Sequence, residues 1–248
     1  MGVSFNQKAI LRTLSVLEPS SVSCGKVRVG GSHDGGYVMA NDFYGNHVGY
    51  SIGVGPQVFW DQEMANRGLE IFQYDHTVDA VPGEHSLFRY FKKGIGPDLN
   101  DPNLMTLERM LEDNGHIEQE HMLLKMDVEG AEWDALDAMR SDIIAKFDQI
   151  VVEYHALDLL HDLQFRNRAE RVFRKLSETH RCIHVHGNNF GGYRIIENIP
   201  IAPVIEVTYG LIGRFNFDSH REEYPTHLDE PCNPAEPDLY LGNFRFRY

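Results

Sequence analysis

The fold is decided by residues 48–75, which read VGYSIGVGPQVFWDQEMANRGLEIFQYD. Short apolar runs at residues 48–52 and 69–74 predict two β-strands. Between them a GVG loop ends the first strand, and Pro56 suits the first position of a helix that would end near Asn66. Because strand, helix and strand follow one another so closely, the two strands are expected to lie parallel in one sheet.

The same alternation continues along the chain to about residue 190. Further strands are expected at residues 88–91, 122–126, 149–154 and 182–185, with helices after Thr106, over residues 133–144 and over residues 165–176. The run at residues 122–126 is apolar on both faces, as is typical of a buried parallel strand. We therefore predict an α/β protein with a doubly wound, Rossmann-like, mostly parallel sheet that carries helices on both faces.

A single domain, residues 1–248, is expected to contain all these elements. Residues 1–47 would form an N-terminal helix and a hairpin cap, because two short strands flank a glycine-rich turn within residues 27–39. Residues 48–190 would form the cofactor-binding core. Residues 191–248 would supply acceptor-site loops and C-terminal strands near residues 195–196, 204–208 and 239–244.

The charge balance restricts the classes of partner. The 23 basic residues stand against 37 acidic ones, a net charge of −14, which argues against nucleic acid or an anionic membrane as the main partner. No run of about 18 apolar residues could span a bilayer, and three cysteines are too few for a disulfide framework. A neutral or cationic substrate and a cytoplasmic location are therefore expected, although a domain trimmed from an anchored protein would look the same.

Ligands of such sheets bind beyond the carboxyl ends of the strands. Gly53 and Gly55 follow the first strand, where they would let the backbone approach a ligand closely. Asp75 ends the second strand 20 residues after Gly55, the place for a carboxylate that accepts both hydroxyls of an adenosine ribose. A dinucleotide site would need a third glycine where Val58 stands, so S-adenosylmethionine, which carries no phosphate, suits the loop better.

One segment, LLKMDVEGAEW at residues 123–133, resembles the K-x-D-x-E-G-A-E signature of the FkbM-type methyltransferases. Further matches are DGGYV at residues 34–38, EYH at residues 153–155 and HVHGNN at residues 184–189, so the resemblance covers roughly residues 25–210. The resemblance is to the methyltransferase-like branch of that family. It implies a class I methyltransferase fold, S-adenosylmethionine as cofactor and methylation of hydroxyl groups on sugars and natural products.

The resemblance also extends the set of candidate cofactor residues. Asp34 and Tyr37, in the upstream match, are expected on the cofactor side of the site. Ser51 stands where class I enzymes usually place an acid, two residues before the first glycine. Asp34, Asp127 or a backbone carbonyl could contact the methionine amine in its place.

Methylation of a sugar hydroxyl needs help with the proton, because such a hydroxyl is barely ionised at neutral pH. Asp127, Glu153 and His155 follow neighbouring predicted strands and could hold one Mg²⁺ or Mn²⁺. His155 or His186 could instead act as a general base, which makes both histidines and Asp127 the catalytic candidates. His184 is expected to point away from the pocket, and the acidic residues 218–230 to form a solvated loop.

The leading interpretation is thus an S-adenosylmethionine-dependent O-methyltransferase whose small-molecule or glycan acceptor is a sugar, glycoside or similar small polyol, with a divalent cation as a further candidate cofactor. A Rossmann-type NAD(P)-dependent oxidoreductase is the enzyme alternative, disfavoured by Val58 and by the lack of a Tyr-x-x-x-Lys pair. A relic of the fold that binds a nucleoside or glycan without turnover is the non-enzymatic alternative.

Overall fold

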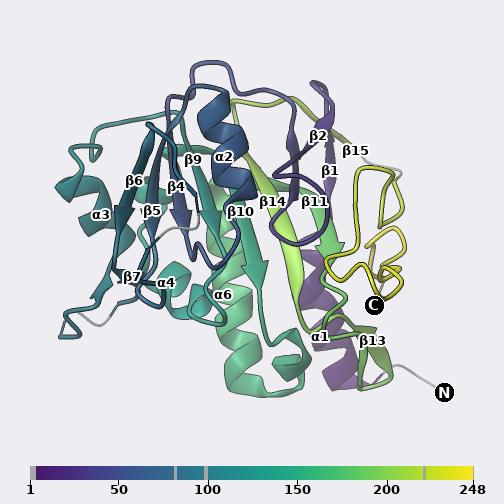
Figure 1. The fold of residues 1–248 in the computed structure, drawn as a ribbon. Helices are drawn as coiled ribbons and strands as arrows, with labels where there is room; N and C mark the ends of the chain where they lie inside the picture. Colours follow the sequence, from purple (N-terminus) through teal and green to yellow (C-terminus); the bar gives the residue numbers. More distant parts are fainter. Residues whose placement is uncertain (1–3, 81–82, 98–99, 220–221, 248) are drawn as a thin grey trace.

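The computed structural model describes residues 4–80, 83–97, 100–219 and 222–247, built around one seven-stranded sheet (Figure 1). The strand order is β11-β14-β10-β9-β4-β5-β6. The strands are β4 (Val48–Ile52), β5 (Glu70–Tyr74), β6 (Phe88–Phe91), β9 (Met122–Met126), β10 (Phe147–Tyr154), β11 (His180–Gly187) and β14 (Ile205–Leu211). Neighbours from β10 to β6 run parallel, whereas β14 is antiparallel to both β10 and β11. The predicted α/β class and mostly parallel sheet are confirmed.

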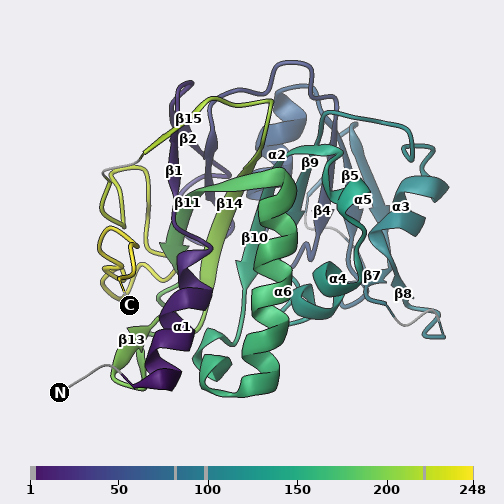
Figure 2. The ribbon, with the colours of Figure 1, turned by 180° about the vertical axis from the view of Figure 1, so that it is seen from behind.

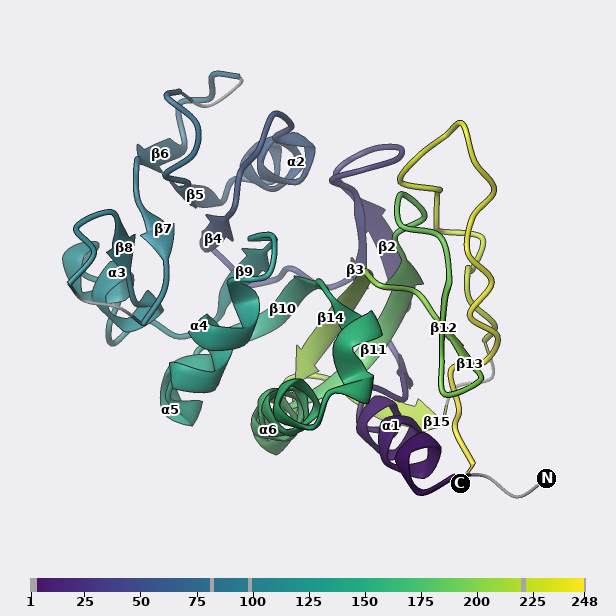
Figure 3. The ribbon, with the colours of Figure 1, turned by 90° about the horizontal axis from the view of Figure 1, so that it is seen from below.

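Two hydrophobic clusters cover the two faces of the sheet. One face packs against α1 (Phe5–Ser15), α3 (Leu107–Asp113), α4 (Glu132–Ala138), α5 (Ser141–Ile144) and α6 (Leu163–Thr179). The other packs against α2 (Phe59–Asn66) and the hairpin of β2 (Lys26–Val29) and β3 (Tyr37–Ala40). Figure 3 shows this division, and Figure 2 shows α1 beside α6. The coverage is unequal, so the doubly wound arrangement stays a prediction.

Smaller elements complete the described chain. They are β1 (Ser20–Val22) paired with β15 (Phe217–Ser219), β7 (Gly94–Ile95) with β8 (Leu104–Met105), β12 (Arg194–Ile196) with β13 (Ile199–Ile201), and the 3₁₀ helix η1 (Leu157–His161). Within the described ranges, no helix combines the length and the apolar character that crossing a bilayer requires.

Two predicted helices differ from the structure. The helix expected from Pro56 begins at Phe59, because Gly55 takes the left-handed conformation (φ +59°) and the chain turns before it becomes helical. The helix expected over residues 133–144 is divided into α4 and α5, because Met139 and Arg140 adopt extended backbone angles.

The C-terminal predictions also need correction. The strand expected at residues 239–244 is absent from the described residues there; a single bridge joins Gly242 to Tyr224. The positive φ angles of Gly242 and Phe244 interrupt the extended chain that a strand needs. Asp229, expected in a solvated loop, is buried and lies 2.7 Å from Nε2 of His184.

Candidate functional site

The carboxyl ends of β4, β5 and β9 open onto a cavity of about 280 Å³. Every residue predicted to bind the cofactor lines it: Asp34, Tyr37, Gly53, Gly55 and Asp75. Asp127 and Glu129, in the loop after β9, form part of its wall. The fold thus brings the glycine loop and the acid at the end of β5 to one edge, where the strand-end argument expected them, and adds the β2–β3 turn, to which the family resemblance had pointed.

The two loop glycines have different physical roles. A Cβ atom on Gly53 would stand 1.5 Å from the carbonyl oxygen of Asp127, so a side chain has no room there. A Cβ atom on Gly55 would have no atom within 4 Å. Gly53 therefore allows the ends of β4 and β9 to approach each other, and Gly55 leaves space open at the cavity.

Asp75 uses its carboxylate to hold the glycine loop. One oxygen accepts hydrogen bonds from the backbone N–H groups of Val54 (3.0 Å) and Gly55 (3.1 Å), and the other accepts two from Thr77. Burial would raise the pKa of Asp75, but the hydrogen bonds from Thr77, Gly55 and Val54 outweigh it and lower the pKa. A ribose hydroxyl at Asp75 would have to compete with the bonds from Thr77 or from the loop.

Lys125 is a cation that sequence reasoning gave no role. It lies in β9, beside Ser51 of β4, and its ammonium group donates to the carbonyl oxygen of Gly53. A lysine inside an otherwise apolar strand was the available signal. Ser51, which occupies the expected position of an acid, is fully buried, and its hydroxyl favours the ionised form of the neighbouring Asp61.

His155 lies among carboxylates at the end of β10. Its Nε2 is 3.4 Å from Glu129, 3.5 Å from Glu153 and 4.0 Å from Asp127. Of the three predicted metal ligands, Asp127 and His155 share one group of ligand atoms with Glu129, whereas Glu153, although close to His155, is grouped with Asp34 and Glu206. An imidazole nitrogen with several carboxylate oxygens is a donor set that suits a divalent cation.

Glu132, the last acid of the K-x-D-x-E-G-A-E segment, orients His155. It is fully buried, and one of its oxygens accepts the backbone N–H of His155 (2.7 Å) and lies 3.3 Å from Nδ1. Its other oxygen accepts the N–H of Gly130 (2.8 Å). Burial lowers the pKa of His155, but Glu132, Asp127 and Glu129 outweigh that effect and raise it. With a proton on Nδ1, the opposite nitrogen faces the acids around the site.

Glu153 is 4% exposed and lies behind this group. One of its oxygens accepts a hydrogen bond from the side chain of Asn188 (3.0 Å); the other has no partner among the described residues. Burial, together with the charges of Asp127, Glu206 and Asp34, raises the pKa of Glu153 well above its ordinary value. Burial and the neighbouring negative charges therefore favour the protonated form of Glu153.

His186 lies outside the cavity, in β11. Its Nδ1 is 2.7 Å from Glu206 and its Nε2 is 3.1 Å from Asp238, so carboxylates occupy both ring nitrogens. Burial lowers the pKa of His186, but Glu206, Asp238 and Cys232 raise it far more. To act as a base or a metal ligand, as predicted, His186 would have to lose one of these partners.

The comparison with known families fits this geometry. The chain matches the methyltransferase FkbM domain over residues 40–174. It belongs to the FkbM methyltransferase family. The resemblance expected from the sequence is confirmed, and membership implies the class I fold and S-adenosylmethionine as methyl donor. No curated protein matches the chain.

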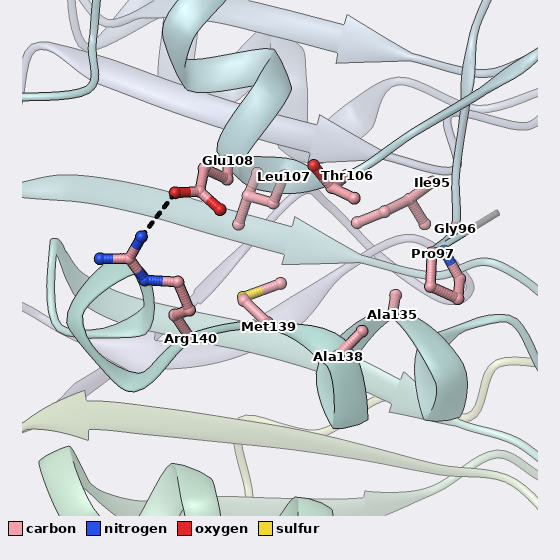
Figure 4. A pocket seen from close by; sticks show the side chains of 10 residues that line it. All are labelled: Ile95, Gly96, Pro97, Thr106, Leu107, Glu108, Ala135, Ala138, Met139 and Arg140. Atoms are coloured by element: carbon pink, nitrogen blue, oxygen red, sulfur yellow. Dashed lines mark hydrogen bonds and ion pairs between the residues drawn. The ribbon is translucent and has the colours of Figure 1, made fainter. Parts of the chain in front are cut away.

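The FkbM match includes the glycine loop, Asp75, the K-x-D-x-E-G-A-E segment and His155, but it ends before His186 and Glu206. A second, smaller cavity of about 60 Å³ lies between α3, α4 and β7 (Figure 4). An ion pair of 2.9 Å joins Arg140 and Glu108 at this cavity. This smaller cavity contains none of the motif residues and is too small for a nucleoside. The strand-end cavity contains the glycine loop, Asp75 and Asp127, and is for that reason the candidate site of the FkbM domain.

Alanine at Gly53 and alanine at Gly55 should have different effects on stability. Gly53→Ala should lower the free energy of unfolding by at least about 3 kcal/mol, because the new methyl group collides with the backbone of Asp127. Gly55→Ala should cost only the left-handed backbone penalty of about 1–2 kcal/mol. Urea denaturation of both proteins measures the difference, and equal losses would contradict the assigned roles.

Glu153 should make the FkbM domain less stable as pH rises. Its folded pKa lies above the value of about 4.3 in an unfolded chain, so the folded state binds more protons and loses stability as pH increases through the folded pKa. Glu153→Gln, which cannot ionise, should reduce this loss in metal-free buffer. Chemical denaturation at pH 5 to 9 tests this. Glu118→Gln, at an exposed side chain before the opposite end of β9, is the control and should keep the wild-type pH dependence.

Proposed function

We propose that this protein transfers a methyl group from S-adenosylmethionine to a hydroxyl group of a sugar, glycoside or similar small polyol, with the help of a divalent cation. The observation that carries the proposal is the group of carboxylates around Nε2 of His155, beside the cavity that the glycine loop forms. In this arrangement a cofactor site lies beside a group that could hold a cation, and a bound cation lowers the pKa of a hydroxyl.

The cavity fits the cofactor. The open space at Gly55 leaves room for a ligand against the backbone, and Gly53, Gly55, Asp75, Asp34 and Tyr37 would hold it. When bound, S-adenosylmethionine supplies an electrophilic methyl group on a positively charged sulfur. Acidic side chains around the cavity favour such a cationic ligand over the pyrophosphate of NAD. That preference supports the methyltransferase over the oxidoreductase alternative.

The residues at the ends of β9 and β10 would bind the acceptor and assist the loss of its proton. Asp127, Glu153 and His155 would hold Mg²⁺ or Mn²⁺, and the cation would bind the acceptor hydroxyl and ease the loss of its proton. Glu132 keeps the imidazole in one orientation, so Nε2 is ready to bind a cation or, in its absence, to accept a proton. Alignment of this hydroxyl with the methyl group would supply much of the rate.

Removal of metal should abolish methyl transfer. The test incubates the protein with S-adenosylmethionine and a panel of sugars and glycosides, after EDTA treatment and after readdition of Mg²⁺ or Mn²⁺. Alanine at Asp127, Glu153 or His155 should lower turnover at least about 100-fold, the scale of losing acid–base or metal assistance, and leave S-adenosylhomocysteine affinity within a few fold.

Calorimetry gives a readout independent of turnover. Because burial and the neighbouring carboxylates raise the pKa of Glu153, Mn²⁺ binding should release protons to the buffer. Full activity in EDTA would overturn the metal role and leave His155 or His186 as a plain base. Binding of S-adenosylhomocysteine with no turnover on any acceptor would favour the non-catalytic relic, and binding of NAD instead would favour the oxidoreductase.

Asp75→Ala should weaken S-adenosylhomocysteine binding by about 1.5–3 kcal/mol, the scale of lost hydrogen bonds to a charged group. The change removes both the proposed ribose contact and the bonds that hold Val54 and Gly55 in place. Asp79→Ala, at a 94% exposed carboxylate, is the matched control and should bind as the wild type does. Equal affinity of folded Asp75→Ala and wild-type protein would remove Asp75 from the cofactor site.

A further inference from the structure

A row of ionisable side chains crosses three neighbouring strands next to the candidate site. Glu153 of β10 pairs directly with Glu206 of β14, and Glu206 pairs directly with His186 of β11. Directly paired residues of adjacent strands present their side chains on the same face of the sheet. The two glutamates therefore stand opposite each other, 4% and 5% exposed, an arrangement that costs stability unless something compensates the charges.

Asp34 brings a third carboxylate to this place from the turn between β2 and β3. Oxygen atoms of Asp34, Glu153 and Glu206 all lie within 4.8 Å of one another. We call these three residues the carboxylate triad. It is distinct from the group at His155, in which Asp127 and Glu129 are the acids that lie closest together with the imidazole.

The hydrogen bonds of the triad leave acceptor positions open. One oxygen of Glu206 is hydrogen-bonded to Nδ1 of His186, and the other accepts a hydrogen bond from the thiol of Cys232. The second oxygen of Glu153, buried beside them, has no partner among the described residues. His186 does not balance the negative charge of the triad, because its Nε2 also lies 3.1 Å from the carboxylate of Asp238. Lys125 also acts on Asp34, so two cations, both shared with other groups, lie near three carboxylates, and the triad carries more negative than positive charge.

We propose that the carboxylate triad of Asp34, Glu153 and Glu206 binds a divalent cation of its own, at a site that adjoins the one at His155 and shares Glu153 with it. Oxygen ligands alone select a hard cation. Ca²⁺ bonds to oxygen at about 2.3–2.6 Å, so one ion can touch oxygens that lie up to about twice that distance apart, which includes the separations in the triad. Mg²⁺, with bonds of about 2.0–2.1 Å and a stricter octahedral geometry, tolerates a narrower range of separations.

The depth of the triad favours an ion over an organic cation. Asp34 lines the cavity, whereas Glu153 and Glu206 are buried behind it. An ammonium group on an acceptor would have to displace the cavity wall to reach all three, but an ion of this size would not. Once bound, the cation would fasten the β2–β3 turn to β10 and β14, and so fix the wall that Asp34 contributes.

The experiment separates this site from the one at His155. His155→Gln provides the background, because it removes the imidazole ligand of the proposed catalytic cation and leaves the triad intact. Calorimetry with Ca²⁺ and electron paramagnetic resonance with Mn²⁺ then count the ions that remain bound. Glu206→Gln and Asp34→Asn are added singly, and Glu129→Gln is the matched control because its acid lies outside the triad.

We expect one equivalent of Ca²⁺ or Mn²⁺ to remain bound in the His155→Gln protein and to raise its thermal unfolding midpoint. Asp34→Asn and Glu206→Gln should each weaken this binding at least tenfold, and Glu129→Gln should leave it within a factor of two. Asp34→Asn keeps the test informative if Glu206→Gln fails to fold. Absence of binding in the His155→Gln background, or binding unchanged by Asp34→Asn, overturns the proposal, whatever the methyl-transfer assay shows.

Discussion

The close contact between Gly53 and the backbone of Asp127 is the constraint on which the candidate site depends. It brings the ends of β4 and β9 together so closely that no side chain fits between them. From this point the glycine loop turns toward Asp75, and the chain after β9 turns toward His155. Cofactor loop and acid group are thus fixed to the same pair of strands, which sets their distance independently of the more exposed loops around them.

The site also concentrates negative charge. Asp34, Asp127, Glu129, Glu153 and Glu206 converge near the cavity, and Lys125, His155 and His186 are the cations beside them among the described residues. Burial of so many acids lowers stability unless they hold protons or bind positive ligands. Such a site favours a sulfonium cofactor and metal ions, and it disfavours phosphate-bearing ligands.

Sequence reasoning predicted the fold best where elements are locally determined. Apolar strands such as Met122–Met126 and the hairpin around residues 27–39 matched closely, because their patterns depend on neighbouring residues only. Strand-end logic also placed Asp75 and His155 at one edge of the sheet. The partners Glu206, Asn188 and Asp238 were missed, because β14 inserts antiparallel between β10 and β11, a long-range pairing that no local pattern encodes.

The insertion of β14 has a consequence for synthesis of the chain. Until residues 205–211 have left the ribosome, β10 has no neighbour on one side, and its backbone donors and acceptors form an open, apolar sheet edge. Open edges of this kind pair with other chains and lead to aggregation. The nascent protein would therefore need protection from intermolecular pairing until β14, the last strand of this sheet in the sequence, pairs with β10 and β11.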